Sequence, residues 1–195
     1  MKLPIVAYGD PILRKKTSEI EENYPDLKQL IDNMFETMYA AHGVGLAAPQ
    51  VGLPIRLFVI DASPFAEDDE DGAGDPLLKE FKKVFINPII VSESGEKKGF
   101  FEGCLSIPDI NEEVMRAPNV VLNYLDENFE EHEVELTGLA ARVVQHEYDH
   151  LEGKLFLDKL GALKKTMLKG RLEAISKGQV RVSYKMKFPN AKKGR

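Results

Sequence analysis

The sequence predicts an α+β fold with antiparallel sheet. Three helices are predicted, at about residues 25–41, 138–152 and 162–177, while short β-rich runs separated by turn residues occupy the middle of the chain. Helices and strands are thus segregated along the sequence and do not alternate regularly, as they would around a parallel sheet. With 195 residues, the chain is long enough for one domain with a hydrophobic core.

The first helical stretch, residues 25–41, has an apolar stripe whose members recur three and four positions apart. The stripe consists of Leu27, Leu30, Ile31, Met34 and Met38. Pro25 suits the first turn of a helix and Gly43 its end. After a glycine-punctuated loop, residues 55–61 form a β-rich run that predicts a strand.

Four more β-rich runs follow, and the turn residues between them predict antiparallel pairing. The runs are residues 84–87, 89–92, 120–126 and 132–136. Before them, residues 66–76 carry six acidic side chains and no basic one. This composition is typical of a mobile surface loop rather than of a binding site.

The last part of the chain predicts two helices and a strand. Residues 138–152 form the second helix, with Thr137 as N-cap and Gly153 just past its end. Its apolar side chains are Leu139, Val143 and Leu151. A third, basic helix is predicted at about 162–177, and residues 179–188 then alternate apolar and polar side chains as a strand does.

Charge is distributed unevenly along the chain, whose net charge is −6. Residues 161–195 hold 11 Lys and Arg and a single acidic residue, Glu173, whereas residues 1–160 hold 15 basic and 31 acidic residues. This asymmetry favours a polyanionic partner for the basic end. The alternative is that a basic C-terminal stretch merely balances an acidic body.

No part of the sequence predicts a membrane anchor or an export signal. No apolar run approaches the roughly 20 residues that span a bilayer, and the N-terminal residues lack the pattern of a signal or transit peptide. A single cysteine permits no intramolecular disulfide and favours a reducing compartment. We therefore expect a cytoplasmic protein without a membrane partner.

The strongest chemical signal is an H-E-x-x-H pattern at residues 146–150, within the second predicted helix. Side chains four positions apart lie on one helix face, so His146 and His150 can bind one metal ion. Glu147 can then face the metal-bound water and serve as its general base. Burying two histidines for packing alone would be costly unless each were paired, which is the alternative interpretation.

Cys104 is the expected third metal ligand, because catalytic sites usually keep three protein ligands and one open position. Gly103 permits close backbone approach beside it. A thiolate and two neutral imidazoles leave a divalent metal with one positive charge, which lowers the pKa of bound water. Taken alone, Cys104 could be a small buried hydrophobe. A downstream acid such as Asp158 could also supply the ligand, as in an H-E-x-x-H endopeptidase.

Residues 43–50, Gly-Val-Gly-Leu-Ala-Ala-Pro-Gln, form a glycine-rich segment that is not a phosphate loop, because no Gly-Lys-Ser/Thr follows. Together with residues 102–106, Glu-Gly-Cys-Leu-Ser, and 145–150, Gln-His-Glu-Tyr-Asp-His, it resembles the three signature motifs of the peptide deformylase family, in the same order. Residues 8–14 also resemble that family's N-terminus. The resemblance runs from about residue 4 to residue 160.

The resemblance implies a role for each motif. The metal ligands would be Cys104, His146 and His150, and Glu147 would be the general base and acid. The side-chain amide of Gln50 and the backbone N–H of Leu105 would hold the oxyanion. The metal would be ferrous iron in the cell, with Zn²⁺, Ni²⁺ or Co²⁺ as substitutes in a purified sample. The implied fold is α+β, with the H-E-x-x-H helix enclosed by antiparallel sheets.

The resemblance also implies the substrate: the N-formyl group of the formyl-methionine that starts a new polypeptide, released as formate. Further residues are expected next to the substrate. They are Val44, Gly45, Glu102, Gly103, Leu139 and Val143. Methionine needs an apolar pocket, and a tight site would exclude acyl groups larger than formyl by steric clash.

We expect residues 1–160 to form the catalytic metallohydrolase core and residues 161–195 to be a basic extension of the same domain. The extension offers a possible contact with the ribosome, and specific DNA binding is not expected. Two features depart from the compact family pattern, namely the acidic stretch 66–76 and the strand-like end of the chain. A rival of another class is a non-catalytic module that binds ribosomes or RNA through the basic end.

Overall fold

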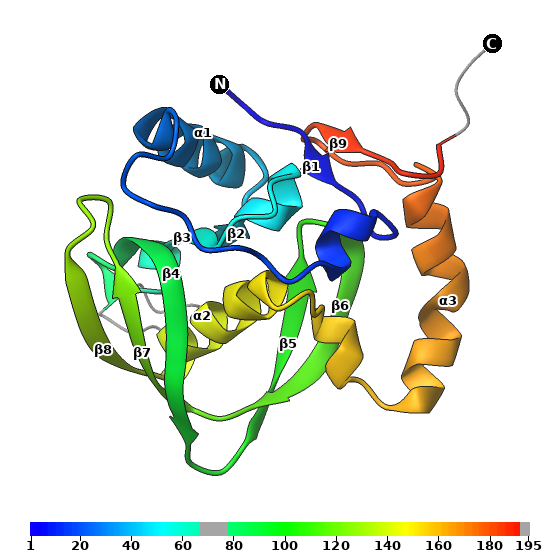
Figure 1. Cartoon of the computed structure of the whole chain (residues 1–195). Helices are drawn as coiled ribbons and strands as arrows, with labels where there is room; N and C mark the ends of the chain where they lie inside the picture. Colours follow the sequence, from blue (N-terminus) through cyan, green and yellow to red (C-terminus); the bar gives the residue numbers. More distant parts are fainter. Residues whose placement is uncertain (67–77, 192–195) are drawn as a thin grey trace.

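Figure 1 shows the computed structural model, which describes residues 1–66 and 78–191. Over these residues the strands form three sheets. The largest is antiparallel in the order β2 (Gly45–Ala47), β3 (Leu57–Asp61), β4 (Lys82–Ser94), β7 (Asn119–Leu125) and β8 (Glu131–Thr137). A separate hairpin pairs β5 (Lys98–Cys104) with β6 (Ile107–Arg116). The third is a short parallel pair of β1 (Ile5–Val6) and β9 (Met186–Lys187).

Three α-helices complete this part of the chain: α1 (Leu27–Ala40), α2 (Gly138–Leu151) and α3 (Ala162–Ser176). Helix α2 runs through the middle of the molecule, with the large sheet on one side and the β5–β6 hairpin on the other (Figure 1). Helix α3 lies at the outside, beside β6. The α+β class and the helix enclosed by antiparallel sheets are confirmed, and the parallel pair of β1 and β9 is an addition to that prediction.

Helix α2 buries a face made mostly of small side chains. This face consists of Ala140, Ala141, Val144 and Leu151, all 5% exposed or less. Small residues let the helix lie close to the sheet, where it packs with Phe58, Phe85 and Leu122. Leu139 and Val143 were expected in the apolar face, but they are only partly buried. They lie on the same side of the helix as His146 and His150, at three-and-four spacing.

The strand predicted at residues 55–61 is present as β3, and those at 120–126 and 132–136 as β7 and β8. The prediction of separate strands at 84–87 and 89–92 is wrong, because both are parts of β4. Asn87 causes the apparent break. It has a positive φ of 49°, and its side chain exchanges two hydrogen bonds with the backbone of Ile20, at 2.8 and 3.0 Å. The pairing of β4 with β7 shifts register there and then continues, as at a β-bulge.

The β5–β6 hairpin was not predicted from the sequence, although it carries Cys104. Its alternation is obscured because Arg116, 2% exposed, stands at a buried position of β6 where an apolar residue would be expected. On β5, Phe100 and Phe101 are both exposed, at 46% and 67%. A pattern search that reads apolar as buried and charged as exposed therefore misses both strands.

The helix ends differ in detail from the predictions. Helix α1 begins at Leu27, so Pro25 precedes it and does not form its first turn. The left-handed residue after this helix is His42, with φ 57°, and Gly43 follows it. Thr137 stands at the N-cap of α2, yet its side chain makes no capping hydrogen bond. Gly153, with φ 67°, lies just past the end of α2 as predicted.

The C-terminal strand prediction, residues 179–188, is mostly wrong, since only Met186–Lys187 pairs as a strand. The alternation that suggested a strand is nevertheless visible as alternating exposed and half-buried residues along the segment. Of the acidic stretch predicted at 66–76, residues 67–76 lie outside the described residues. Within the described ranges, no helix is both long enough and apolar enough to cross a membrane.

Candidate metal centre and catalytic cavity

A cavity of about 610 Å³ lies over one side of α2. Its walls are α2, the β5–β6 hairpin, the loop before β2 and the C-terminal segment 181–184. Nearly all site residues predicted from the sequence line it: Val44, Gly45, Gln50, Glu102, Gly103, Cys104, Leu105, Leu139, Val143, His146 and Glu147. His150 is 1% exposed and lies at the inner end of the group, next to Cys104. The volume suits a small ligand or a peptide end.

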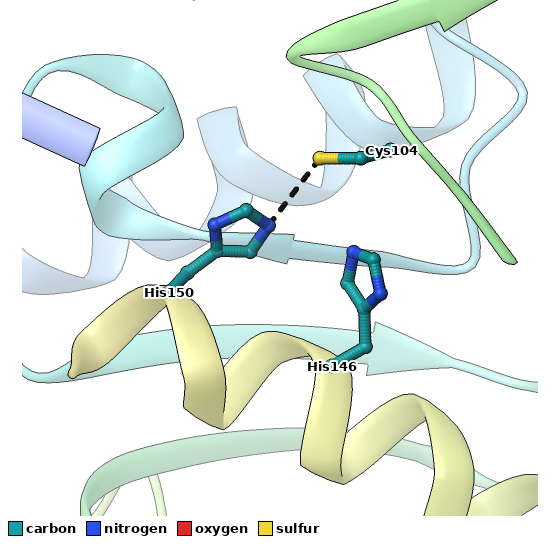
Figure 2. A group of neighbouring side chains, drawn as sticks. All are labelled: Cys104, His146 and His150. Atoms are coloured by element: carbon teal, nitrogen blue, oxygen red, sulfur yellow. Dashed lines mark hydrogen bonds between the residues drawn. The ribbon is translucent and has the colours of Figure 1, made fainter. Parts of the chain in front are cut away.

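The three predicted metal ligands point toward one another, two from α2 and one from the end of β5 (Figure 2). One ligand atom of each lies within 4.8 Å of the other two. The Sγ atom of Cys104 is 3.4 Å from Nε2 of His150. Asp158, the alternative third ligand, is not in this group. Its carboxylate pairs with Arg14 at 2.5 Å and accepts the Leu155 N–H at 2.8 Å.

The donor set fits a single transition-metal ion. One ring nitrogen of His146, Nδ1, bonds Glu102 at 3.0 Å, which leaves Nε2 for the metal, an arrangement common among ligating histidines. Burial, with repulsion from His146 and Arg116, holds the pKa of His150 well below its usual range, so this imidazole is neutral as a ligand must be. A thiolate with two imidazoles is a set that binds iron, zinc, nickel and cobalt far better than magnesium or calcium.

Glu102 was expected next to the substrate, but its carboxylate is fully engaged inside the protein. It accepts hydrogen bonds from Arg116 at 2.7 and 2.9 Å, from Arg142 at 2.7 Å and from His146 at 3.0 Å. Burial alone would raise the pKa of Glu102. The bonds from His146 and Arg116 outweigh burial and hold that pKa well below its usual range. Glu102 therefore fixes the His146 ring while remaining charged.

Sequence reasoning missed the arginines of this network. Arg116 bridges Glu102 and Asp149, whose Oδ2 atom it contacts at 2.8 Å. Arg142 also donates to the backbone carbonyls of Val114 and Lys98, at 3.0 and 2.7 Å, and so ties α2 to the hairpin. The sequence did contain one indication of this network: Arg142 lies one helical turn before His146, on the same face of the helix.

Glu147 stands beside the metal ligands with few competing partners. It is 4% exposed, and its Oε2 atom has no hydrogen-bond partner among the described residues. Burial is the main cause that raises the pKa of Glu147 to about 7, with Glu102 and Asp149 adding to it and His146 opposing it. A carboxyl group with this pKa can both accept and return a proton near neutral pH.

Gln50 is 1% exposed and is oriented by the loop that contains it. Its Oε1 atom accepts the Ala47 N–H at 2.8 Å. The amide nitrogen therefore points into the site, 3.5 Å from Cys104 Sγ and 3.4 Å from Ser106 Oγ. Gln50 thus presents a neutral hydrogen-bond donor, held in place, beside the Cys104 side chain. Leu105, whose backbone N–H is the other expected oxyanion donor, directly follows Cys104 in the sequence.

Residue 45 must be a glycine because the Glu147 carboxylate occupies the space that a side chain at this position would need. A Cβ atom at residue 45 would lie 2.5 Å from Glu147 Oε1, so an alanine there must displace the carboxylate. We expect Gly45→Ala to lower kcat by about 10- to 100-fold, since misplacing a catalytic group by about 1 Å has effects of this size. Steady-state kinetics checks this against Gly170→Ala, where a Cβ has free space. Equal kcat values for the two variants would contradict the close contact.

Comparison with known proteins points to one family. The family model described as "Polypeptide deformylase" matches residues 2–166. A curated peptide deformylase from Christiangramia forsetii is 59% identical over 196 residues, and one from Flavobacterium johnsoniae is 55% identical, each match covering 100% of both chains.

Solved structures give the same result. The crystal structure of a peptide deformylase from Legionella pneumophila is similar with a TM-score of 0.78 and 41% identity, over 93% of this chain and 99% of that one. Peptide deformylase 1B from Arabidopsis thaliana, in complex with an inhibitor, has a TM-score of 0.77 and 39% identity, over 91% and 92% of the two chains.

Proposed function

The chain belongs to the peptide deformylase family, and from this premise we propose how its residues divide the reaction among them. The protein is a metal-dependent hydrolase that removes the N-formyl group from the formyl-methionine of newly made polypeptides. One observation carries the assignment of residues: Cys104, His146 and His150 converge at the wall of the cavity that also contains Glu147.

Cys104, His146 and His150 are the residues that would hold the metal. A bound ion supplies Lewis acidity there, which lowers the pKa of a water molecule and polarises the formyl carbonyl. We propose ferrous iron as the metal in the cell, with zinc, nickel or cobalt as substitutes. Elemental analysis of protein purified without oxygen tests this identity, and zinc as the main metal would contradict it.

Glu147 is the proposed general base and acid. It takes a proton from the attacking water as the water oxygen bonds to the formyl carbon. It returns that proton to the amine nitrogen as the carbon–nitrogen bond breaks, so that formate and a free amino terminus leave. Its Oε2 atom, which has no hydrogen-bond partner in the part of the chain that the structure describes, and the raised pKa of Glu147 support this role.

Gln50 and Leu105 are the proposed oxyanion donors. Gln50 contributes its side-chain amide, which the Ala47 N–H already orients, and Leu105 its backbone N–H. Losing one donor of this kind typically removes about 3 kcal/mol of transition-state stabilisation.

The substrate backbone is proposed to lie along Val44 and Gly45, at the start of β2. The Val44 carbonyl accepts the Asp61 N–H at 2.9 Å, while the Val44 N–H has no backbone partner within the described ranges, which supports its proposed role as a donor to the substrate. Leu139 and Val143, partly buried on the cavity side of α2, would line the methionine pocket. Gly103, which has no side chain, would contribute its backbone, and a Cβ at this position would lie 2.4 Å from Asn111 Oδ1.

The test of this function is a comparison of three peptides with the ferrous protein under anaerobic conditions. The first peptide begins with formyl-Met and the second with acetyl-Met. The third has a free amino terminus, so that only its internal peptide bonds can be cleaved. We expect formate from the first and at least about 100-fold slower release of acetate from the second, because a tight site would exclude an acyl group larger than formyl by steric clash. Cleavage of internal bonds at a comparable rate would favour the endopeptidase instead.

The basic C-terminal segment is proposed to belong to the catalytic domain and to contact the ribosome. Leu168, Leu172 and Ile175 of α3 share a hydrophobic cluster with the catalytic body, which supports one domain for residues 1–160 and 161–195. The outer face of α3 exposes several lysines next to Leu163 and Met167, at 75% and 73% exposure.

Because the substrate is a nascent chain, we place the enzyme beside translating ribosomes in the cytoplasm. Co-sedimentation with ribosomes over a salt series tests the contact, with Lys165→Glu and Lys169→Glu together as the variant. Binding should weaken steeply with salt and in the variant. Binding insensitive to both would reject it.

A further inference from the structure

The C-terminal segment forms one wall of the catalytic cavity, although it lies beyond residues 2–166, which the family model matches. Residues 181–184 line the cavity. The Tyr184 hydroxyl donates to the Leu105 carbonyl at 2.8 Å, and the Gln179 N–H donates to the Ala174 carbonyl of α3 at 2.9 Å. Just beyond Tyr184, β9 pairs with β1. The wall is therefore fixed at both ends and needs little ordering when a ligand binds.

A second cavity, of about 630 Å³, adjoins the first. It lies between the start of β6, the end of α3 and residues 178–181. Three residues line both cavities: Pro108, Asp109 and Arg181. The two cavities are therefore neighbours with Arg181 on the boundary between them, and the second lies on the side of the end of α3.

A polypeptide substrate must leave the catalytic cavity on some path, because only its formylated end reacts. An extended chain advances about 3.3 Å per residue. A chain that extends from the catalytic cavity along the wall formed by residues 181–184 would therefore pass Arg181 on its way to the second cavity. The same wall that closes the catalytic cavity can then guide the chain outward.

The second cavity has an excess of positive charge. Arg171 and Arg181 both line it, and neither forms an ion pair with a carboxylate in the described part of the chain. Arg171 donates to the backbone carbonyl of Asp109, which holds its guanidinium at the cavity. The Asp109 carboxylate is the one acidic group among the lining residues. The lining residues of the second cavity therefore carry two positive charges and one negative charge.

We infer that this second cavity is an exit subsite for the polypeptide that follows the formyl-methionine, and that Arg181 makes it select acidic side chains in that polypeptide. The inference rests on the proposed deformylase function and extends it to the downstream residues of the substrate. Arg181 is a specificity-determining residue that acts on the substrate several positions away from the reacting bond.

The test uses formyl-Met hexapeptides that are otherwise alanine, with a single Asp or Lys at position 3, 4, 5 or 6. With the full-length metal-loaded enzyme, kcat/KM should favour Asp over Lys by about two- to five-fold at one or two positions, as expected for an exposed ion pair. The ratio should fall toward one in Arg181→Gln. It should also fall in about 0.5 M salt, where such pairs are screened.

Lys185→Gln is the matched control, because Lys185 is an exposed cation of the same segment that lines neither cavity. It should keep both the activity and the Asp/Lys ratio of the unmodified enzyme. Arg171→Gln should reduce the ratio only at positions later than those that respond to Arg181. The order in which the two arginines affect successive substrate positions tests whether the polypeptide passes Arg181 before Arg171.

Equal kcat/KM values for Asp and Lys at all four positions would overturn the exit subsite while leaving deformylation intact. An Asp preference that survives Arg181→Gln, or disappears equally in Lys185→Gln, would also overturn it, because general attraction by the basic segment would then be the cause. A lack of formate from every peptide would instead count against the proposed function itself.

Discussion

Replacing Glu147 with glutamine is expected to lower kcat for a formyl-Met peptide by about 10³- to 10⁴-fold. The amide keeps the size of the side chain but can neither take the proton of the attacking water nor return it to the leaving amine, and both transfers are assigned to this carboxyl group. The side chains of the three proposed metal ligands are unchanged. Metal content should therefore stay at the level of the unmodified protein, and KM should change little.

Glu133→Gln, an exposed change on β8, is the control for this prediction. Its kcat should match that of the unmodified enzyme. The measurement combines steady-state formate release with elemental analysis of the same samples. A kcat of Glu147→Gln within about tenfold of the unmodified enzyme, with metal bound, would assign proton transfer to another group.

Glu102→Gln is expected to have the largest effect on the fold, by loss of about 3–5 kcal/mol in the free energy of unfolding. The Glu102 carboxylate is the shared partner of Arg116, Arg142 and His146, and it is 7% exposed. A neutral amide leaves two largely buried guanidinium groups short of negative charge. The same change releases Nδ1 of His146, so metal affinity should fall by about 10- to 100-fold.

Denaturant unfolding of the metal-free protein separates the two effects, and competition with a chelator measures metal affinity. Glu113→Gln, an exposed change on the same hairpin, should alter the free energy of unfolding by less than about 0.5 kcal/mol. If Glu102→Gln resembled this control in stability and in metal affinity, the carboxylate network would not support the site.

Much of the site could be predicted from local sequence, because its parts obey simple spacing rules. His146 and His150 lie one helical turn apart, and Cys104 is the only thiol in the chain. The supporting network could not be predicted in this way. Arg116 and Arg142 can be buried because Glu102 and Asp149 supply the compensating negative charge, and these partnerships join β5, β6 and α2 in space. No pattern within one segment contains such information.

The same limit explains the errors in the fold. Helix α3 could be placed by its composition alone, and β7 and β8 by alternation. The β5–β6 hairpin was not predicted because some of its buried positions hold charged side chains, whose ion-pair partners lie on other elements of the structure. The residues around Tyr184 alternate like a strand, but they pack against the catalytic cavity instead of pairing. The alternating burial of residues 179–188 explains the strand-like sequence pattern. Whether such a segment pairs as a strand or packs against a cavity depends on tertiary contacts that the pattern does not contain.

One metal ion at Cys104, His146 and His150 is expected to make this chain a deformylase. The experiment titrates the metal-stripped protein with ferrous ion, without oxygen, while formate release from a formyl-Met peptide is followed. We expect no formate release before metal is added, a linear rise in the rate of release up to one ion per chain, and a constant rate beyond it. Cys104→Ala should need at least about tenfold more metal. Formate release by the metal-free protein, or a Cys104→Ala titration that matches that of the unmodified protein, would show that a metal ion at these three residues is not the source of the activity.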